Sequence, residues 1–124
     1  MAGTEVLFYQ EANGSSPVVD WLEQLRCADV KAYAKCVAVV ERLMDVGHEL
    51  RRPTADMLRD GIYELRARKG RVNYRLLYFF HGRHVAILAH ALTKEQAVPA
   101  IEIERALARK RAFEADPERH TYRE

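Results

Sequence analysis

The sequence lacks several features that mark specialised classes of protein. It has only two cysteines, Cys27 and Cys36, and its first residues carry neither the basic nor the apolar stretch of a secretory signal. We therefore expect reduced thiols and a cytoplasmic location. No apolar run approaches the roughly 20 residues that span a bilayer, which argues against a membrane protein. His81 and His84 have no carboxylate or cysteine beside them at ligand spacing, so we expect no metal site, and we expect no cofactor.

What is present suits one globular domain. The chain has 124 residues, of which 48% are hydrophobic and 31% charged. It shows no internal repeat, low-complexity tract or linker. We expect a single domain over residues 1–116 and a polar C-terminal tail over 117–124.

The net charge of +2 conceals an uneven distribution. Residues 1–50 carry a net charge of −4, residues 51–83 carry +6, and residues 84–124 are balanced. The basic block is either a footprint for a phosphate backbone or a solvated basic face, and charge alone favours the second interpretation.

Periodicity and turn residues predict an α+β fold. The predicted elements are, in chain order, a strand over 4–10, helices opened by Pro17 and Asp29, strands over 62–69, 72–81 and 84–92, and a helix opened by Pro99. Ser16 is placed to cap the first helix and Gly47 to end the second, and residues 48–61 are expected to form a loop. The order βααβββα predicts an antiparallel sheet with helices packed on one face.

Two-residue hairpin turns would align four polar residues on one face of this sheet. A turn at Gly70-Arg71 places Arg66 opposite Arg75, and a turn at Gly82-Arg83 places Arg75 opposite His90. Lys94 continues on that face if the last strand runs that far. A three-residue loop would break the row.

Like charges directly opposite one another destabilise a sheet, so the Arg66–Arg75 pair would need a negative charge nearby. Glu64 lies on the same face but two positions away, so no acidic residue shares the row. An external phosphate would supply the missing negative charge, and arginine binds phosphate bidentately. The alternative is that both arginines reach water or pair with the acidic helices. His90 can exchange protons near neutral pH, although a lone strand histidine is more commonly satisfied by a neighbour.

Other residues are candidates for contact with RNA. Tyr74, Tyr78 and Phe80 share the other face and are expected in the core, whereas Phe79 lies on the arginine face and could stack on a base. The full set of predicted RNA contacts is Arg51, Arg52, Arg68, Lys69, Arg71 and Phe79.

Nearly the whole chain resembles a known toxin group. The segments FYQEANGSSPVVDWLEQL and DGIYELRARKGRVNYRLLYFFHGRHVAILAHALTKEQAVPAIEIERALARK carry the likeness. Their most specific pieces are the YELR strand, the YR-hydrophobic-YFF strand, the strand ending in TK and the Pro-initiated helix. In this order and spacing they resemble the phage-derived HigB-like branch of the RelE/ParE toxin superfamily.

The resemblance implies a toxin of a type II toxin–antitoxin module. Such toxins are mRNA endoribonucleases that act at the ribosomal A site and inhibit translation. They use no metal, and attack by the 2′-hydroxyl leaves a 2′,3′-cyclic phosphate. The implied partner is a helix-turn-helix antitoxin, through which alone the toxin would meet operator DNA. Arg66, Arg75 and Lys94 occupy the family's phosphate-contacting positions, which makes them catalytic candidates together with His90.

The chain also departs from its relatives. No tyrosine stands at residues 98–100, where some RelE-like enzymes aim one at the message, and no aspartate lies between residues 61 and 115. The general base is assigned first to His90 and second to Lys94. Two alternatives stay open: a ParE-like protein that binds and inhibits DNA gyrase, and an inactive phage remnant.

Overall fold

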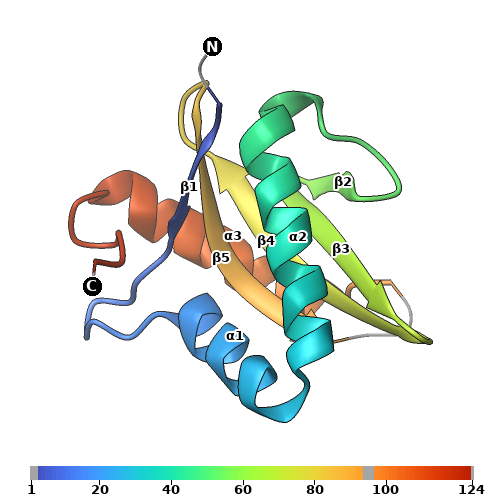
Figure 1. Cartoon of the computed structure of the whole chain (residues 1–124). Helices are drawn as coiled ribbons and strands as arrows, with labels where there is room; N and C mark the ends of the chain where they lie inside the picture. Colours follow the sequence, from blue (N-terminus) through green and yellow to red (C-terminus); the bar gives the residue numbers. More distant parts are fainter. Residues whose placement is uncertain (1–2, 94–96, 124) are drawn as a thin grey trace.

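The computed structural model describes residues 3–93 and 97–123 and has an α+β fold, as predicted (Figure 1). Its elements are β1 (Glu5–Phe8), α1 (Pro17–Ala28), α2 (Val30–Val46), a 3₁₀ turn η1 (Gly47–Glu49), β2 (Ala55–Arg59), β3 (Ile62–Lys69), β4 (Val72–Phe80), β5 (Val85–Thr93) and α3 (Ala100–Ala115). The strands form one five-stranded sheet in the order β1-β5-β4-β3-β2. β2 to β5 are antiparallel, whereas β1 joins β5 in parallel.

The boundaries of α2 follow from its terminal residues. The Asp29 carboxylate accepts a hydrogen bond from the Ala32 amide at 3.1 Å, and Gly47 ends the helix with φ +62°. Ser16 stands at the N-cap of α1, but it does not cap the helix. Its hydroxyl donates instead to the carbonyl of Tyr9, the residue after β1, at 2.8 Å and links the helix start to the end of that strand.

β2 is an additional strand within the segment that was expected to be a loop. It pairs with β3 through a tight turn at Asp60-Gly61, where both residues have positive φ (51° and 82°). Asp-Gly is a strong type I′ turn signal, so the sequence contained the information. The segment reads poorly as a strand because β2 is an edge strand, with exposed Met57 and Arg59 alternating with half-buried residues.

The helices cover both faces of the sheet, which corrects the expectation of one face. α1 and α2 pack on the face that carries Leu65, Leu76 and Tyr78, whereas α3 packs on the opposite face through Leu107 and Phe113. In Figure 1, α2 crosses in front of the sheet and α3 lies behind it. The face covered by α3, here called the α3 face, also carries the predicted arginine row.

The C-terminal tail runs beside β1. Thr121 pairs with Tyr9, and the Tyr122 amide donates to the Phe8 carbonyl at 2.8 Å. The His120 ring stacks on Tyr9 with centroids 5.3 Å apart. These contacts hold the described part of the tail against the edge of the sheet.

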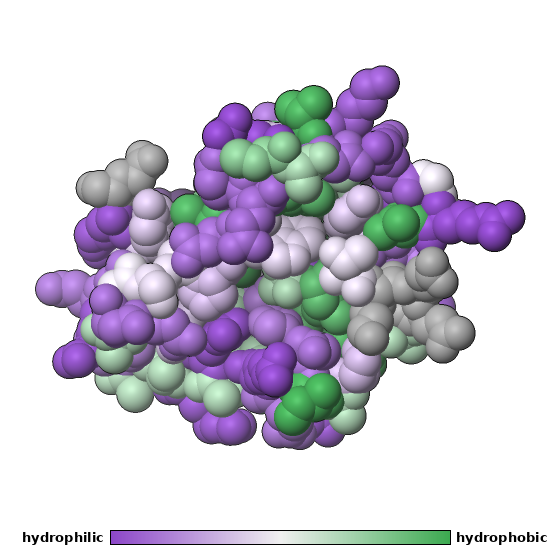
Figure 2. Space-filling view, turned by 90° about the horizontal axis from the view of Figure 1, so that it is seen from below, coloured by the Kyte–Doolittle hydropathy of each residue, from purple (hydrophilic) through white to green (hydrophobic). Residues whose placement is uncertain are grey.

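The face of the molecule seen in Figure 2 is mostly polar. The exposed large hydrophobic residues among those described are Val30, Met44, Val46, Met57 and Ile101. On the face seen in Figure 2, hydrophobic residues form small separate groups among hydrophilic ones, so this face offers no broad apolar contact area. No helix in the described ranges has the length and apolar character needed to cross a membrane.

Gly47→Ala is expected to lower the free energy of unfolding by about 2–3 kcal/mol. The residue has φ +62°, and a Cβ there would lie 2.3 Å from the Thr4 hydroxyl oxygen. Gly82→Ala is the control, because Gly82 has φ +72° but nothing within 4 Å. It should lose only about 1 kcal/mol. Urea unfolding measures both, and equal losses would show that the Thr4 contact is easily relieved.

Candidate functional site on the α3 face

The predicted pairing of Arg66 with Arg75 is confirmed. The turn at Gly70-Arg71 has two residues, Lys69 pairs with Val72, and Arg66 lies directly opposite Arg75. Positive φ at Gly70 (63°) permits this tight turn. The hairpin therefore brings two guanidinium groups to neighbouring strands on the α3 face.

The predicted pairing of Arg75 with His90 is wrong, although both lie on the same face. His81 bonds to Val85 across a three-residue loop, and the register shifts once more between Leu77 and Tyr78. His90 consequently lies opposite Leu77, and Leu92 lies opposite Arg75. The two shifts cancel in parity, since a shift of two residues returns side chains to the same face.

Arg75 has an internal acidic partner. Glu64 lies opposite Leu77, two positions from Arg66 on the same face as predicted, and its carboxylate reaches diagonally to form an ion pair with Arg75. The two side chains are only 6% and 7% exposed. The arginine row therefore has a counter-charge that straight cross-strand pairing did not identify.

Arg66 is in a different situation. It is half-buried, and its Nε is buried without a hydrogen-bond partner in the described part of the chain. A nearby carboxylate, Asp56, pairs with Arg52 at 2.9 Å. The Arg52 bond holds the pKa of Asp56 below its usual range, and the charge of Arg66 contributes a smaller lowering. Arg66 is thus a guanidinium with an unused donor at the border of the site.

His90 belongs to a network that α3 completes. Arg109 donates to His90 Nδ1 and to the Ala89 carbonyl, both at 2.8 Å, and His90 Nε2 contacts Glu102. Arginine can only donate, so Nδ1 must accept, and the ring proton of neutral His90 lies on Nε2. Glu102 also lies 3.6 Å from Arg105. Sequence reasoning missed Glu102 and Arg109, which lie seven residues apart on α3, beside its apolar stripe.

The pKa of His90 should lie below the ordinary value of about 6.5. Burial is the main cause, the Glu102 carboxylate opposes it, and the Arg109 charge adds to it. The neutral ring therefore stabilises the fold, and this contribution declines as the pH falls below about 6.5. NMR titration of the His90 imidazole should give a midpoint below 6.5. Arg109→Met should raise it and Glu102→Gln should lower it, and a wild-type midpoint at or above 6.5 would contradict the network.

The predicted RNA contacts are dispersed. Phe79 is completely buried and packs edge-on against Phe113, so it is not available to stack on a base. Lys69 pairs with Asp29 at 2.5 Å on the opposite face. Arg68 and Arg71 are exposed near the hairpin tip, and the remaining exposed candidates are Arg51 and Arg52, beside β2. Lys94 lies outside the described residues.

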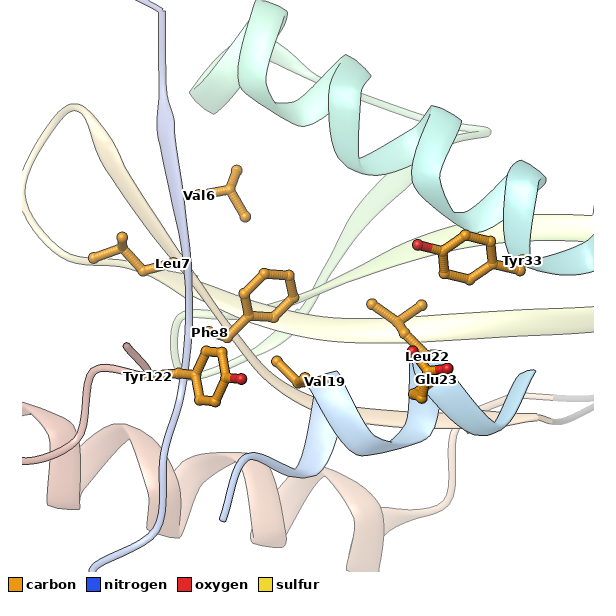
Figure 3. Close-up of a pocket in the computed structure, with 8 residues that line it drawn as sticks. All are labelled: Val6, Leu7, Phe8, Val19, Leu22, Glu23, Tyr33 and Tyr122. Carbon is orange, nitrogen blue, oxygen red and sulfur yellow. The ribbon is translucent and has the colours of Figure 1, made fainter. Parts of the chain in front are cut away.

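Two larger cavities flank the sheet. One of about 500 Å³ is lined by β1, α1, Tyr33 and Tyr122, and Figure 3 shows Val6 and Phe8 on the side of β1 that faces the helices while Leu7 points the other way. None of the described residues that line it is basic. The other, of about 590 Å³, lies between η1 and β2 and includes Arg51, Arg52 and Tyr63. Within the described ranges, no three histidine, cysteine or acidic side chains converge as a metal site would require.

The site thus offers two guanidinium groups and a histidine–carboxylate pair on one sheet face. Guanidinium groups stabilise phosphate charge, and the pair can accept a proton. Comparison with known families shows that residues 23–111 match the family described as phage derived protein Gp49-like (DUF891). A search of curated proteins finds no match.

Proposed function

The chain belongs to the phage-derived Gp49-like family, which groups candidate toxins of toxin–antitoxin pairs, and we propose that it is a toxin that cleaves mRNA. The proposal extends to the HigB-like mode of action, in which the toxin cuts ribosome-bound message at the A site. A cognate antitoxin would then neutralise it.

One observation carries the proposal: Arg66 and Arg75 face each other on the same sheet face as the His90–Glu102 pair. Cleavage of RNA by its own 2′-hydroxyl needs positive charge at the phosphate and a proton acceptor beside it. In this scheme Arg66, which is half-buried and in no ion pair among the described residues, binds the scissile phosphate through its guanidinium group. Arg75 is buried and its charge is balanced by Glu64, so it supports the sheet beneath the site while Arg66 makes the phosphate contact.

We assign the proton acceptor to Glu102, which His90 orients. Both ring nitrogens of His90 are engaged, and its side chain is 10% exposed, whereas that of Glu102 is 19% exposed. The 2′-oxygen loses its proton to Glu102 as it bonds to phosphorus, and the bond to the 5′-oxygen breaks. The leaving oxygen takes a proton from Lys94 or from water. The products are a 2′,3′-cyclic phosphate and a 5′-hydroxyl.

Induction of the protein in cells without an antitoxin tests the function. Primer extension should reveal new 5′ ends within translated messages, and growth should stop. If DNA breaks appear while messages stay intact, the protein acts as a gyrase inhibitor. If growth and transcripts are both unchanged, it is an inactive remnant. Arg75→Ala is a poor probe here, because it would leave Glu64 buried without its partner.

A further inference from the structure

The cavity between η1 and β2 combines aromatic, apolar and cationic side chains. Its lining includes Leu50, Met57, Tyr63, Arg51 and Arg52. Met57 is 57% exposed despite its apolar side chain, and both arginines are exposed. The cavity is therefore open to solvent and carries an apolar surface next to positive charge.

Its aromatic wall is rigidly supported from behind. The Tyr63 ring stacks on Tyr78 with centroids 5.4 Å apart and also meets Phe80 edge-on at 5.4 Å. The His48 ring, which also lines the cavity, stacks on Phe80 at 3.6 Å. Because Tyr78 is buried and Tyr63 only half-buried, the Tyr63 ring is held in place while part of it stays accessible.

The cavity lies on the face of the sheet that α1 and α2 cover, around the edge strand β2 from the candidate cleavage site, and one short chain of charges at that edge links the two. Asp56 lines the cavity and pairs with Arg52, and the same carboxylate feels the charge of Arg66. The Arg52 pair neutralises Asp56, so Arg51 and Arg66 leave this border positive. Because β2 is the edge strand of the sheet, an anionic chain that binds at Arg66 can pass around it and enter the cavity on the other face.

We propose that this cavity binds one unstacked base of single-stranded RNA, adjacent to the nucleotide that is cleaved. The inference rests on the proposed function and extends it by assigning a specificity subsite. The base stacks on Tyr63 and contacts Met57, while Arg51 holds the flanking phosphate and Arg52 keeps Asp56 neutralised. Single-stranded RNA is recognised through such aromatic platforms with cationic borders.

Binding and crosslinking of short oligonucleotides test this subsite without requiring cleavage. Oligoribonucleotides with 4-thiouridine should crosslink to Tyr63, Met57 or His48 on irradiation, and mass spectrometry locates the crosslink. Tyr63→Leu should weaken RNA binding roughly tenfold, because stacking on one ring is lost. Tyr63→Phe keeps the ring and should stay within about twofold of wild type.

Two matched variants separate the cavity from general effects. Tyr33→Leu makes the same change in the other cavity, where none of the described lining residues is basic, and should not alter RNA binding (Figure 3). Met57→Glu should weaken binding by repelling phosphate. Met44→Glu adds the same charge at a comparably exposed methionine outside the cavity and should have a smaller effect.

The outcomes distinguish this inference from the proposed function. If the wild type cleaves message but Tyr63→Leu binds RNA normally and no crosslink maps to the cavity, the subsite is wrong and the function stands. If crosslinks map to the cavity but the wild type cleaves no message, the function fails and the RNA site stands. If Tyr63→Leu weakens binding of an antitoxin but not of RNA, the cavity is a peptide groove and the proposal is overturned.

Discussion

Glu64→Gln is expected to lower the free energy of unfolding by about 3–5 kcal/mol. Glu64 and Arg75 form an ion pair in which the side chains are 7% and 6% exposed. Glutamine has the shape of glutamate but no charge, so the Arg75 guanidinium would stay buried beside a neutral amide. Breaking a buried pair costs far more than the pair contributes, because the remaining charge cannot recover its hydration.

Two further variants make this prediction specific, with urea unfolding as the measurement. Glu104→Gln removes the acid of the exposed Arg59–Glu104 pair, whose side chains are 42% and 52% exposed, and should cost less than about 1 kcal/mol. The double variant Glu64→Leu with Arg75→Leu removes both buried charges and should be more stable than Glu64→Gln alone. A loss below about 1 kcal/mol for Glu64→Gln would mean that other contacts of Arg75 hold its charge.

Arg66→Ala is expected to reduce cleavage of ribosome-bound message by about 100-fold or more, if the proposed function is correct. The side chain is half-buried and none of the ion pairs among the described residues includes it, so its guanidinium can accept a phosphate as its charge partner. Arg66→Lys keeps the charge but loses the planar fork, and should recover only part of the rate. Stability should change little, because no described ion pair includes Arg66.

Arg68→Ala is the matched control for this experiment. Arg68 is two residues further along the same face of β3, but it is exposed and donates to the Gly70 carbonyl at 2.8 Å. Its loss should change the rate less than about threefold. Initial rates of primer-extension product formation compare the variants. Equal losses for both arginines would indicate a diffuse basic surface and no specific phosphate contact.

Local signals in the sequence predicted much of the fold. Asp29 and Gly47 define the ends of α2, and Gly70-Arg71 defines the turn that opposes Arg66 and Arg75. These features depend on residues close together in the chain, where capping and turn geometry act directly. The missed strand β2 also had a local signal, at Asp60-Gly61, hidden by the irregular pattern of an edge strand.

The arrangement of the site depended on contacts between distant segments. The loop after His81 and the register shift near Ala89 moved His90 from Arg75 to Leu77, and neither departs visibly from an ordinary strand pattern. Because the two shifts add up to two residues, His90 still lies on the predicted face of the sheet, but its neighbour across the strand is Leu77 and not Arg75.

The sequence alone was enough to place the two arginines opposite each other, because strand alternation and the Gly70-Arg71 turn are local properties. His90 lies on the predicted face only because two register shifts cancel in parity. Packing of α3 on that face determined the chemistry of these residues. It buried His90 between Glu102 and Arg109. The diagonal reach of Glu64 gave Arg75 an internal partner and left Arg66 as the guanidinium with an unused donor. Such pairings form because an unpaired charge is costly when it is buried. Which charges become buried depends on how the whole chain packs.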